Sequence, residues 1–150
     1  YDERQYCSPG FNLPVGCLMR SPHGSFPEYH TSADNLDFVR PENLATSLDA
    51  YRHVVEVLEG NGSYLNLNPK CEPQLGRRGL YSAVGADPNQ KLDQMALLWV
   101  LNLSDGAHSL LDVCEMANLP FREIKRAADA LERVGLLRKC AAEPPAPTGS

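Results

Sequence analysis

Residues 121–139 read FREIKRAADALERVGLLRK, and this stretch decides the fold of the C-terminal part of the chain. Its apolar side chains recur at intervals of three and four residues, which places them on one face of an α-helix. They are Phe121, Ile124, Ala127, Ala128, Leu131 and Val134. Gly135 can end this helix, because glycine readily adopts the left-handed backbone found after a helix C-terminus. Residues 136–140 are then predicted to form a strand.

Two further helices are predicted immediately upstream. Asp93 and Ser109 each precede a run of apolar residues, and each can accept a backbone hydrogen bond in the first turn of a helix. The first helix is expected to end at a turn over residues 104–106, and residues 118–120 form the turn between the second and third. Three helices, a tight turn and a following strand are typical of a winged helix-turn-helix domain, which we assign to residues 91–142.

Residues 1–59 have a different pattern. Residues 13–19 (LPVGCLM) are a short apolar run, which predicts a buried strand. After Pro41, apolar residues recur at helical spacing until Gly60, which predicts an amphipathic helix. One strand and one helix cannot enclose a core, so we expect this region to be the edge of a larger α/β domain and the chain to be a piece of a longer protein.

Two segments are rich in residues that interrupt regular structure. Residues 60–90 contain many Gly, Pro, Asn and Asp residues, which predicts a connector between the two domains. Residues 143–150 (EPPAPTGS) are rich in proline, which predicts a disordered tail.

Composition narrows the class of protein. The 150 residues are 43% hydrophobic and 22% charged, which is typical of a folded chain. A net charge of -5 argues against general binding of nucleic acid or anionic lipid, because such binding depends on excess Lys and Arg. The five cysteines include no C-x-x-C pair, which favours reduced thiols in a cytoplasmic protein. No apolar run approaches the roughly 18 residues of a membrane span.

The most chemically suggestive segment is residues 26–35, FPEYHTSADN. It places the His30 imidazole in a loop, with hydroxyl and carboxylate groups nearby. A neutral imidazole is a common metal ligand, and Thr31 or Asp34 could supply the hydrogen bond that fixes its tautomer. From spacing alone, a single loop histidine is more often an ordinary surface residue than a ligand.

Residues 6–16 (YCSPGFNLPVG) and 27–36 (PEYHTSADNL) resemble the C-terminal part of bacterial aminopeptidase-like proteins. This family belongs to the co-catalytic zinc exopeptidases, and some members are associated with polysaccharide biosynthesis. The resemblance continues through residues 73–81 (PQLGRRGLY) and 97–106 (LLWVLNLSDG) and covers nearly the whole chain. It implies an α/β fold, in which the edge of a zinc-exopeptidase α/β/α core is followed by a small winged helix-turn-helix domain.

The resemblance also implies roles for particular residues. His30 matches the last zinc ligand of the family, and Tyr29 matches a tyrosine that can donate a hydrogen bond to the tetrahedral intermediate. Asp2 is similar to an active-site acid of the related glutaminyl cyclases. Glu3 stands where those enzymes carry histidine, which leaves Asp2 only a candidate. The remaining ligands of two zinc ions are expected upstream of Tyr1.

We therefore expect the full-length protein to be a zinc-dependent, aminopeptidase-like metallopeptidase acting on peptide or aminoacyl substrates. The 150-residue segment is expected to be inactive alone, because a catalytic zinc takes about three protein ligands plus water. The alternative is a cytoplasmic winged-helix module that binds nucleic acid or protein without catalysis. Residues 91–140 carry seven basic and seven acidic residues, which is a poor match for phosphates and favours a protein partner or a homo-oligomer.

Overall fold

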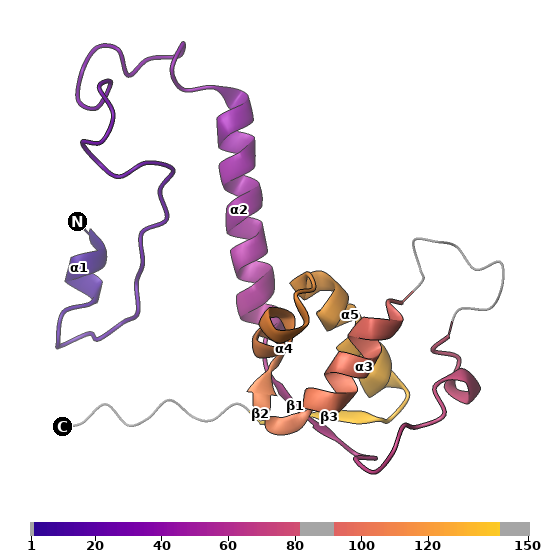
Figure 1. Ribbon diagram of the computed structural model, residues 1–150. Helices are drawn as coiled ribbons and strands as arrows, with labels where there is room; N and C mark the ends of the chain where they lie inside the picture. The colour runs from indigo at the N-terminus through magenta and orange to yellow at the C-terminus, as the bar shows by residue number, and fades with distance from the viewer. Residues whose placement is uncertain (1, 82–91, 142–150) are drawn as a thin grey trace. The chain divides into compact units, whose positions relative to one another are not determined.

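The computed structural model describes residues 2–81 and 92–141. The chain folds as two compact units, Tyr1–His53 and Val54–Ser150. The elements in chain order (Figure 1) are α1 (Asp2–Tyr6), α2 (Pro41–Gly60), β1 (Ser63–Asn66), the 3-10 helix η1 (Gly76–Arg78), α3 (Gln94–Leu103), β2 (Asp105–Ser109), α4 (Leu110–Ala117), α5 (Phe121–Arg133) and β3 (Leu137–Lys139).

The first unit contains α1, a long loop region and most of α2, and residues 2–53 form no strand. The strand expected over residues 13–19 is therefore wrong. A strand needs a hydrogen-bonded partner, and the described part of this unit offers none. The side chains of Leu13, Leu18 and Met19 are exposed instead, as expected of an apolar run that does not enclose a core by itself.

Helix α2 begins at Pro41, as predicted, and continues to Gly60. The Tyr51 hydroxyl donates to the Leu18 carbonyl at 2.9 Å, and the Arg20 guanidinium donates to the Asn43 carbonyl at 3.2 Å. These bonds attach the preceding loop to the helix. The apolar stripe of α2 nevertheless stays open, since Leu44 and Leu48 are both 61% exposed.

The second unit contains a three-stranded antiparallel sheet with the strand order β2-β1-β3 (Figure 1). Strand β1 lies in the middle, where Ser63 pairs with Ser109 of β2 and Tyr64 pairs with Lys139 of β3. The expected connector over residues 60–90 thus supplies the central strand. It also supplies Tyr64, Leu75 and Leu80 to the core. Residues 82–90 of that segment and the tail over residues 143–150 lie outside the described residues.

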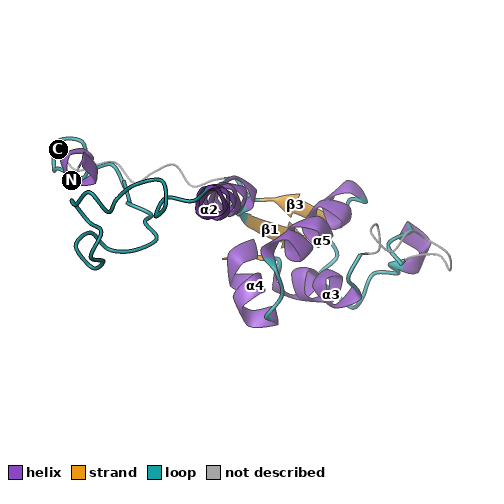
Figure 2. Cartoon of the chain, turned by 90° about the horizontal axis from the view of Figure 1, so that it is seen from above, coloured by secondary structure: helices purple, strands orange, loops and turns teal. Residues whose placement is uncertain are grey.

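The core of this unit confirms the predicted helical stripe. Ile124, Ala127, Ala128 and Leu131 of α5 are fully buried. Burying a side chain the size of leucine stabilises the fold by about 1.5–3 kcal/mol relative to leaving it exposed. Helices α3, α4 and α5 pack with the sheet around this core (Figure 2).

The predicted helix boundaries are confirmed by their hydrogen bonds. The Asp93 carboxylate accepts from the backbone N–H groups of Met95 and Ala96, which caps α3. Ser109 caps α4, and Asn118 ends it in the left-handed conformation, with φ 52°. Gly135 ends α5 with φ 72°, after which β3 follows as predicted.

Strand β2 replaces part of the turn expected over residues 104–106. Its sequence, DGAHS, shows no alternation of apolar and polar residues. This segment is a strand because it pairs with β1. Its own residues therefore gave no sign that a strand would form here.

Candidate functional site

The loop that carries His30 is built from local hydrogen bonds. The Thr31 hydroxyl donates to the Glu28 carbonyl at 2.9 Å and accepts from the Ala33 N–H at 3.2 Å. The Asn35 side chain accepts from the Asp37 N–H at 2.9 Å. These side-chain bonds replace the regular ladders of a helix or a sheet and define successive turns.

His30 is exposed and has a positive φ of 57°, a conformation that is uncommon for residues other than glycine. Its ring stacks on the Tyr29 ring, with centroids 4.1 Å apart and planes 18° from parallel. Tyr29 also contacts the rings of His23 and Phe26, each at 5.6 Å between centroids. The imidazole therefore lies at the surface as one member of an aromatic cluster around Tyr29.

The other expected site residues are not gathered around His30. Asp2 is exposed on α1, and no hydrogen bond or ion pair joins it to Tyr29 or His30 among the described residues. The Thr31 hydroxyl is occupied by Glu28 and does not orient the imidazole. Of the expected constellation, the structure brings together Tyr29 and His30 alone.

The described residues do not form a metal cage. Within residues 2–81 and 92–141, no group of three or more His, Cys, Asp or Glu side chains could hold a metal ion. A catalytic zinc needs about three protein ligands and an open position. The described part of the chain therefore does not by itself fit a zinc centre.

Helix α5 presents a surface on which charges are paired. Lys125 pairs with Asp129 one turn further on, as the spacing predicts. Arg126 lies 3.5 Å from Glu123, and Arg122 lies 3.2 Å from Glu56 of α2. Because each of these cations already faces a carboxylate, the helix offers little net positive charge to a phosphate backbone.

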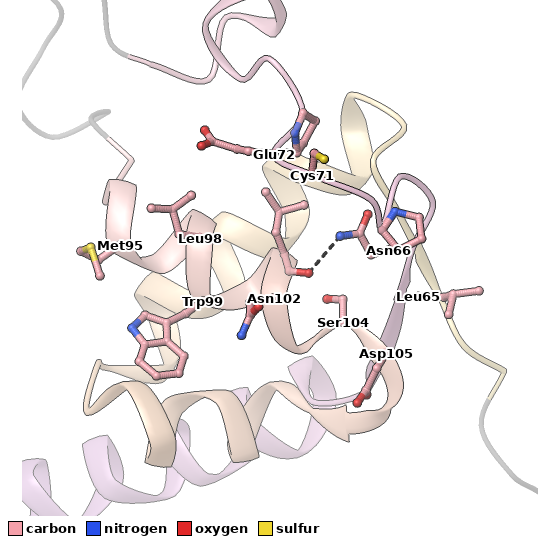
Figure 3. A pocket seen from close by; sticks show the side chains of 13 residues that line it. Leu65, Asn66, Cys71, Glu72, Met95, Leu98, Trp99, Asn102, Ser104 and Asp105 are labelled. Carbon is pink, nitrogen blue, oxygen red and sulfur yellow. Dashed lines mark hydrogen bonds between the residues drawn. The ribbon is translucent and has the colours of Figure 1, made fainter.

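A groove of about 760 Å³ opens between β1, the segment after it and α3 (Figure 3). Trp99 is only partly buried and lines this groove. One feature of the sequence indicated that α3 has an exposed apolar side. Helix α3 is apolar around its circumference, with Met95, Leu98 and Trp99 lying outside the fully buried positions.

The described helices include none that is both long and apolar enough to cross a membrane.

All five cysteines are free thiols, and burial raises the pKa of the Cys114 thiol.

Comparison with known families identifies the larger unit. Residues 62–139, more than half of the chain, match the family model for winged helix-turn-helix domains. The chain belongs to the winged helix-turn-helix family. The match includes β1, in agreement with the place of that strand at the centre of the sheet. Residues 1–61 match a second model, described as a domain of unknown function (DUF4910).

Relatives of this winged helix-turn-helix protein support the resemblance found in its sequence. A Clostridium acetobutylicum protein, named as a candidate polysaccharide biosynthesis protein with an aminopeptidase-like domain, is 56% identical over 137 residues. The crystal structure of a candidate peptidase from Clostridium acetobutylicum is 52% identical and superimposes with a TM-score of 0.77 over 93% of this chain. The chain spans 31% of the length of the first relative and 30% of the second.

Proposed function

We propose that the chain is the C-terminal part of a cytoplasmic, aminopeptidase-like hydrolase and supplies one ligand, His30, to a site with two zinc ions. The other ligands would lie in the remainder of the longer protein. The observation that carries this proposal is the exposed imidazole, held in a left-handed backbone and stacked on Tyr29. The 56% identity to a protein named for its aminopeptidase-like domain supports it.

Two further residues have roles in this proposal. The Tyr29 hydroxyl would donate a hydrogen bond to the oxyanion that develops on a peptide or aminoacyl substrate. Asp2 would act as a hydrogen-bonding acid. The 150 residues alone would show no peptidase activity, because a single imidazole cannot hold a catalytic zinc.

The exposed apolar faces of the first unit support the same proposal. Leu44 and Leu48 on α2 and the run over residues 13–19 are open to solvent in the described chain. Large exposed apolar faces mark interaction surfaces. In the longer protein they would pack against the rest of an α/β core.

Zinc content and hydrolysis of aminoacyl amides by the longer protein test the proposal. We expect His30→Ala to lose bound zinc and activity, whereas His53→Ala, a change on the exposed surface of α2, should keep both. Tyr29→Phe should keep the zinc and lower kcat by about 10²–10³-fold, the usual cost of losing an oxyanion donor. A longer protein that purifies without metal and binds none, or turnover by the 150-residue chain with zinc, would contradict the proposal.

We further propose that the winged helix is a protein-interaction domain, either with another protein or with a second copy. The paired charges of α5 support this over a role in reading nucleic acid. Mobility-shift titrations at low salt should show no tight complex with duplex DNA. A tight complex whose affinity falls steeply with salt would restore the nucleic-acid alternative.

A further inference from the structure

The groove beside α3 is a distinct feature of the second unit and contains none of the residues assigned above to the zinc site (Figure 3). One wall is the exposed side of α3, and the opposite wall is the segment that follows β1.

The wall formed by α3 is apolar and open. Met95 is 55% exposed, and Leu98 and Trp99 are only partly buried against the core. Pro69 and Pro73 face the groove from the opposite wall. Exposed aromatic and methionine side chains are enriched where proteins contact a partner, so this wall suits an apolar anchor residue.

The polar groups at the floor of the groove are already satisfied within the protein. The Asn66 amide donates to the Leu101 carbonyl at 2.9 Å (Figure 3), and its oxygen accepts from the Asn68 N–H at 2.9 Å. The Ser104 hydroxyl donates to the Val100 carbonyl at 2.6 Å. An apolar side chain can therefore cover this floor without leaving a buried donor or acceptor unpaired.

The charged residues that the structure describes along the groove are both acidic. They are Glu72 and Asp105, and neither Lys nor Arg is among the described lining residues. Hydrogen bonds from the His108 and Ala107 N–H groups hold the pKa of Asp105 at about 2, so this carboxylate is ionised at neutral pH. Its second oxygen lies 2.9 Å from Nδ1 of the His108 ring, which is partly exposed beside it. Glu72 is exposed and accepts a hydrogen bond from the Tyr81 hydroxyl at 3.0 Å.

One exposed amide can bind a peptide backbone. Asn102 lies on α3 at the edge of the groove, and its side chain makes no hydrogen bond within the described residues. An amide offers both a donor and an acceptor, which matches the alternating groups of an extended peptide.

From these features, we propose that the groove is a docking site for an extended segment of a partner protein that carries an apolar residue flanked by Lys or Arg. The apolar side chain lies on Trp99, Met95 and Leu98. The basic groups face Glu72 and Asp105, and the segment's backbone bonds to Asn102.

Trp99 is the single tryptophan of the chain, so its fluorescence reports on the groove. The probes are acetyl-Arg-Leu-Pro-Leu-Arg-amide and its acidic counterpart, acetyl-Glu-Leu-Pro-Leu-Glu-amide. We expect the basic peptide to shift Trp99 emission saturably and the acidic peptide to leave it unchanged. Glu72→Gln should lower the affinity for the basic peptide by about two- to fivefold, which is the range for an ion pair at an exposed rim.

Glu115→Gln is the matched control, because Glu115 is exposed on α4 and does not line the groove. Its affinity for the basic peptide should equal that of the unchanged chain, and circular dichroism confirms that both variants are folded. Equal binding of the two peptides, no saturable shift, or equal effects of the two substitutions would overturn the proposal. So would a Trp99 already shielded from acrylamide, because the groove would then be covered by a second copy or by the chain itself.

Discussion

Ser109 and Asp112 hold each other at the start of α4. The Asp112 carboxylate accepts from the Ser109 N–H at 2.7 Å, while the Ser109 hydroxyl oxygen accepts from the Asp112 N–H at 3.3 Å. This reciprocal pair satisfies two backbone donors that a helix N-terminus otherwise leaves unpaired. Since α4 has only eight residues, its first turn is a large share of the helix.

Replacing Ser109 with alanine should therefore destabilise the winged helix. Loss of an N-cap side chain costs about 1 kcal/mol, within a range of about 0.5–2. Urea unfolding of the second unit, followed by Trp99 fluorescence, measures this cost. Ser21→Ala is the control, because Ser21 is exposed in the loop region of the first unit. A midpoint unchanged by Ser109→Ala would contradict the importance of the cap.

The stability of the second unit should fall in acid because of Asp105. The pKa of this carboxyl is lowered from 3.8 to about 2, first by the His108 N–H and then by the Ala107 N–H. A lowered pKa in the folded state means that the contribution is present above 3.8 and is lost as the pH falls to about 2. Asp112, whose pKa is also lowered, acts in the same direction.

Asp105→Asn keeps an oxygen that can accept from Ala107 but removes the titration. We expect its unfolding free energy to fall less between pH 3.8 and about 2 than that of the unchanged chain. Glu115→Gln, a change outside this turn, should leave the pH dependence as it is. Parallel curves for Asp105→Asn and the unchanged chain would show that the turn makes no contribution.

Leu131 should be among the most costly positions to truncate. It is fully buried on α5, and Leu→Ala at such sites costs about 2–5 kcal/mol through lost burial and the cavity left behind. Met116→Ala is the comparison, because Met116 is 53% exposed on α4 and should change stability by about 0.5 kcal/mol or less. Urea midpoints that fall equally for both variants would place Leu131 outside the core.

A substitution of Gly135 should destabilise the second unit, and backbone conformation alone is the reason. Its φ is 72°, yet a Cβ at this position would meet no atom within 4 Å. Gly135→Ala should cost roughly 1–2 kcal/mol, the penalty for a side chain in the left-handed region. Gly10→Ala, also without a close neighbour and without a positive φ, should cost nothing measurable in thermal unfolding.

Local patterns predicted the helices of the second unit well. The stripe from Ile124 to Leu131 and the caps at Asp93 and Ser109 all depend on residues within a few positions of one another. The strands β1 and β2 escaped prediction because their partners lie far away in the sequence. The run over residues 13–19 misled for a related reason, since apolar content alone does not create a partner strand.

The candidate site also has a part that the sequence predicted and a part that it did not. The resemblance drew attention to Tyr29 and His30, and the structure adds the stacking of their two rings. The groove beside α3 could not be predicted, because its walls, one with Pro69 and Pro73 and the other with Trp99, come from separate segments of the chain. No local spacing encodes such an arrangement.

The central place of β1 has a consequence for biosynthesis. A ribosome makes Tyr64 long before Lys139, its partner across the sheet. Until Lys139 emerges, one edge of β1 has no neighbour, and pairings between such distant residues form slowly. Nascent chains stalled before Leu137 should therefore expose a naked strand edge to chaperones and proteases, and release of the last strand should end that exposure.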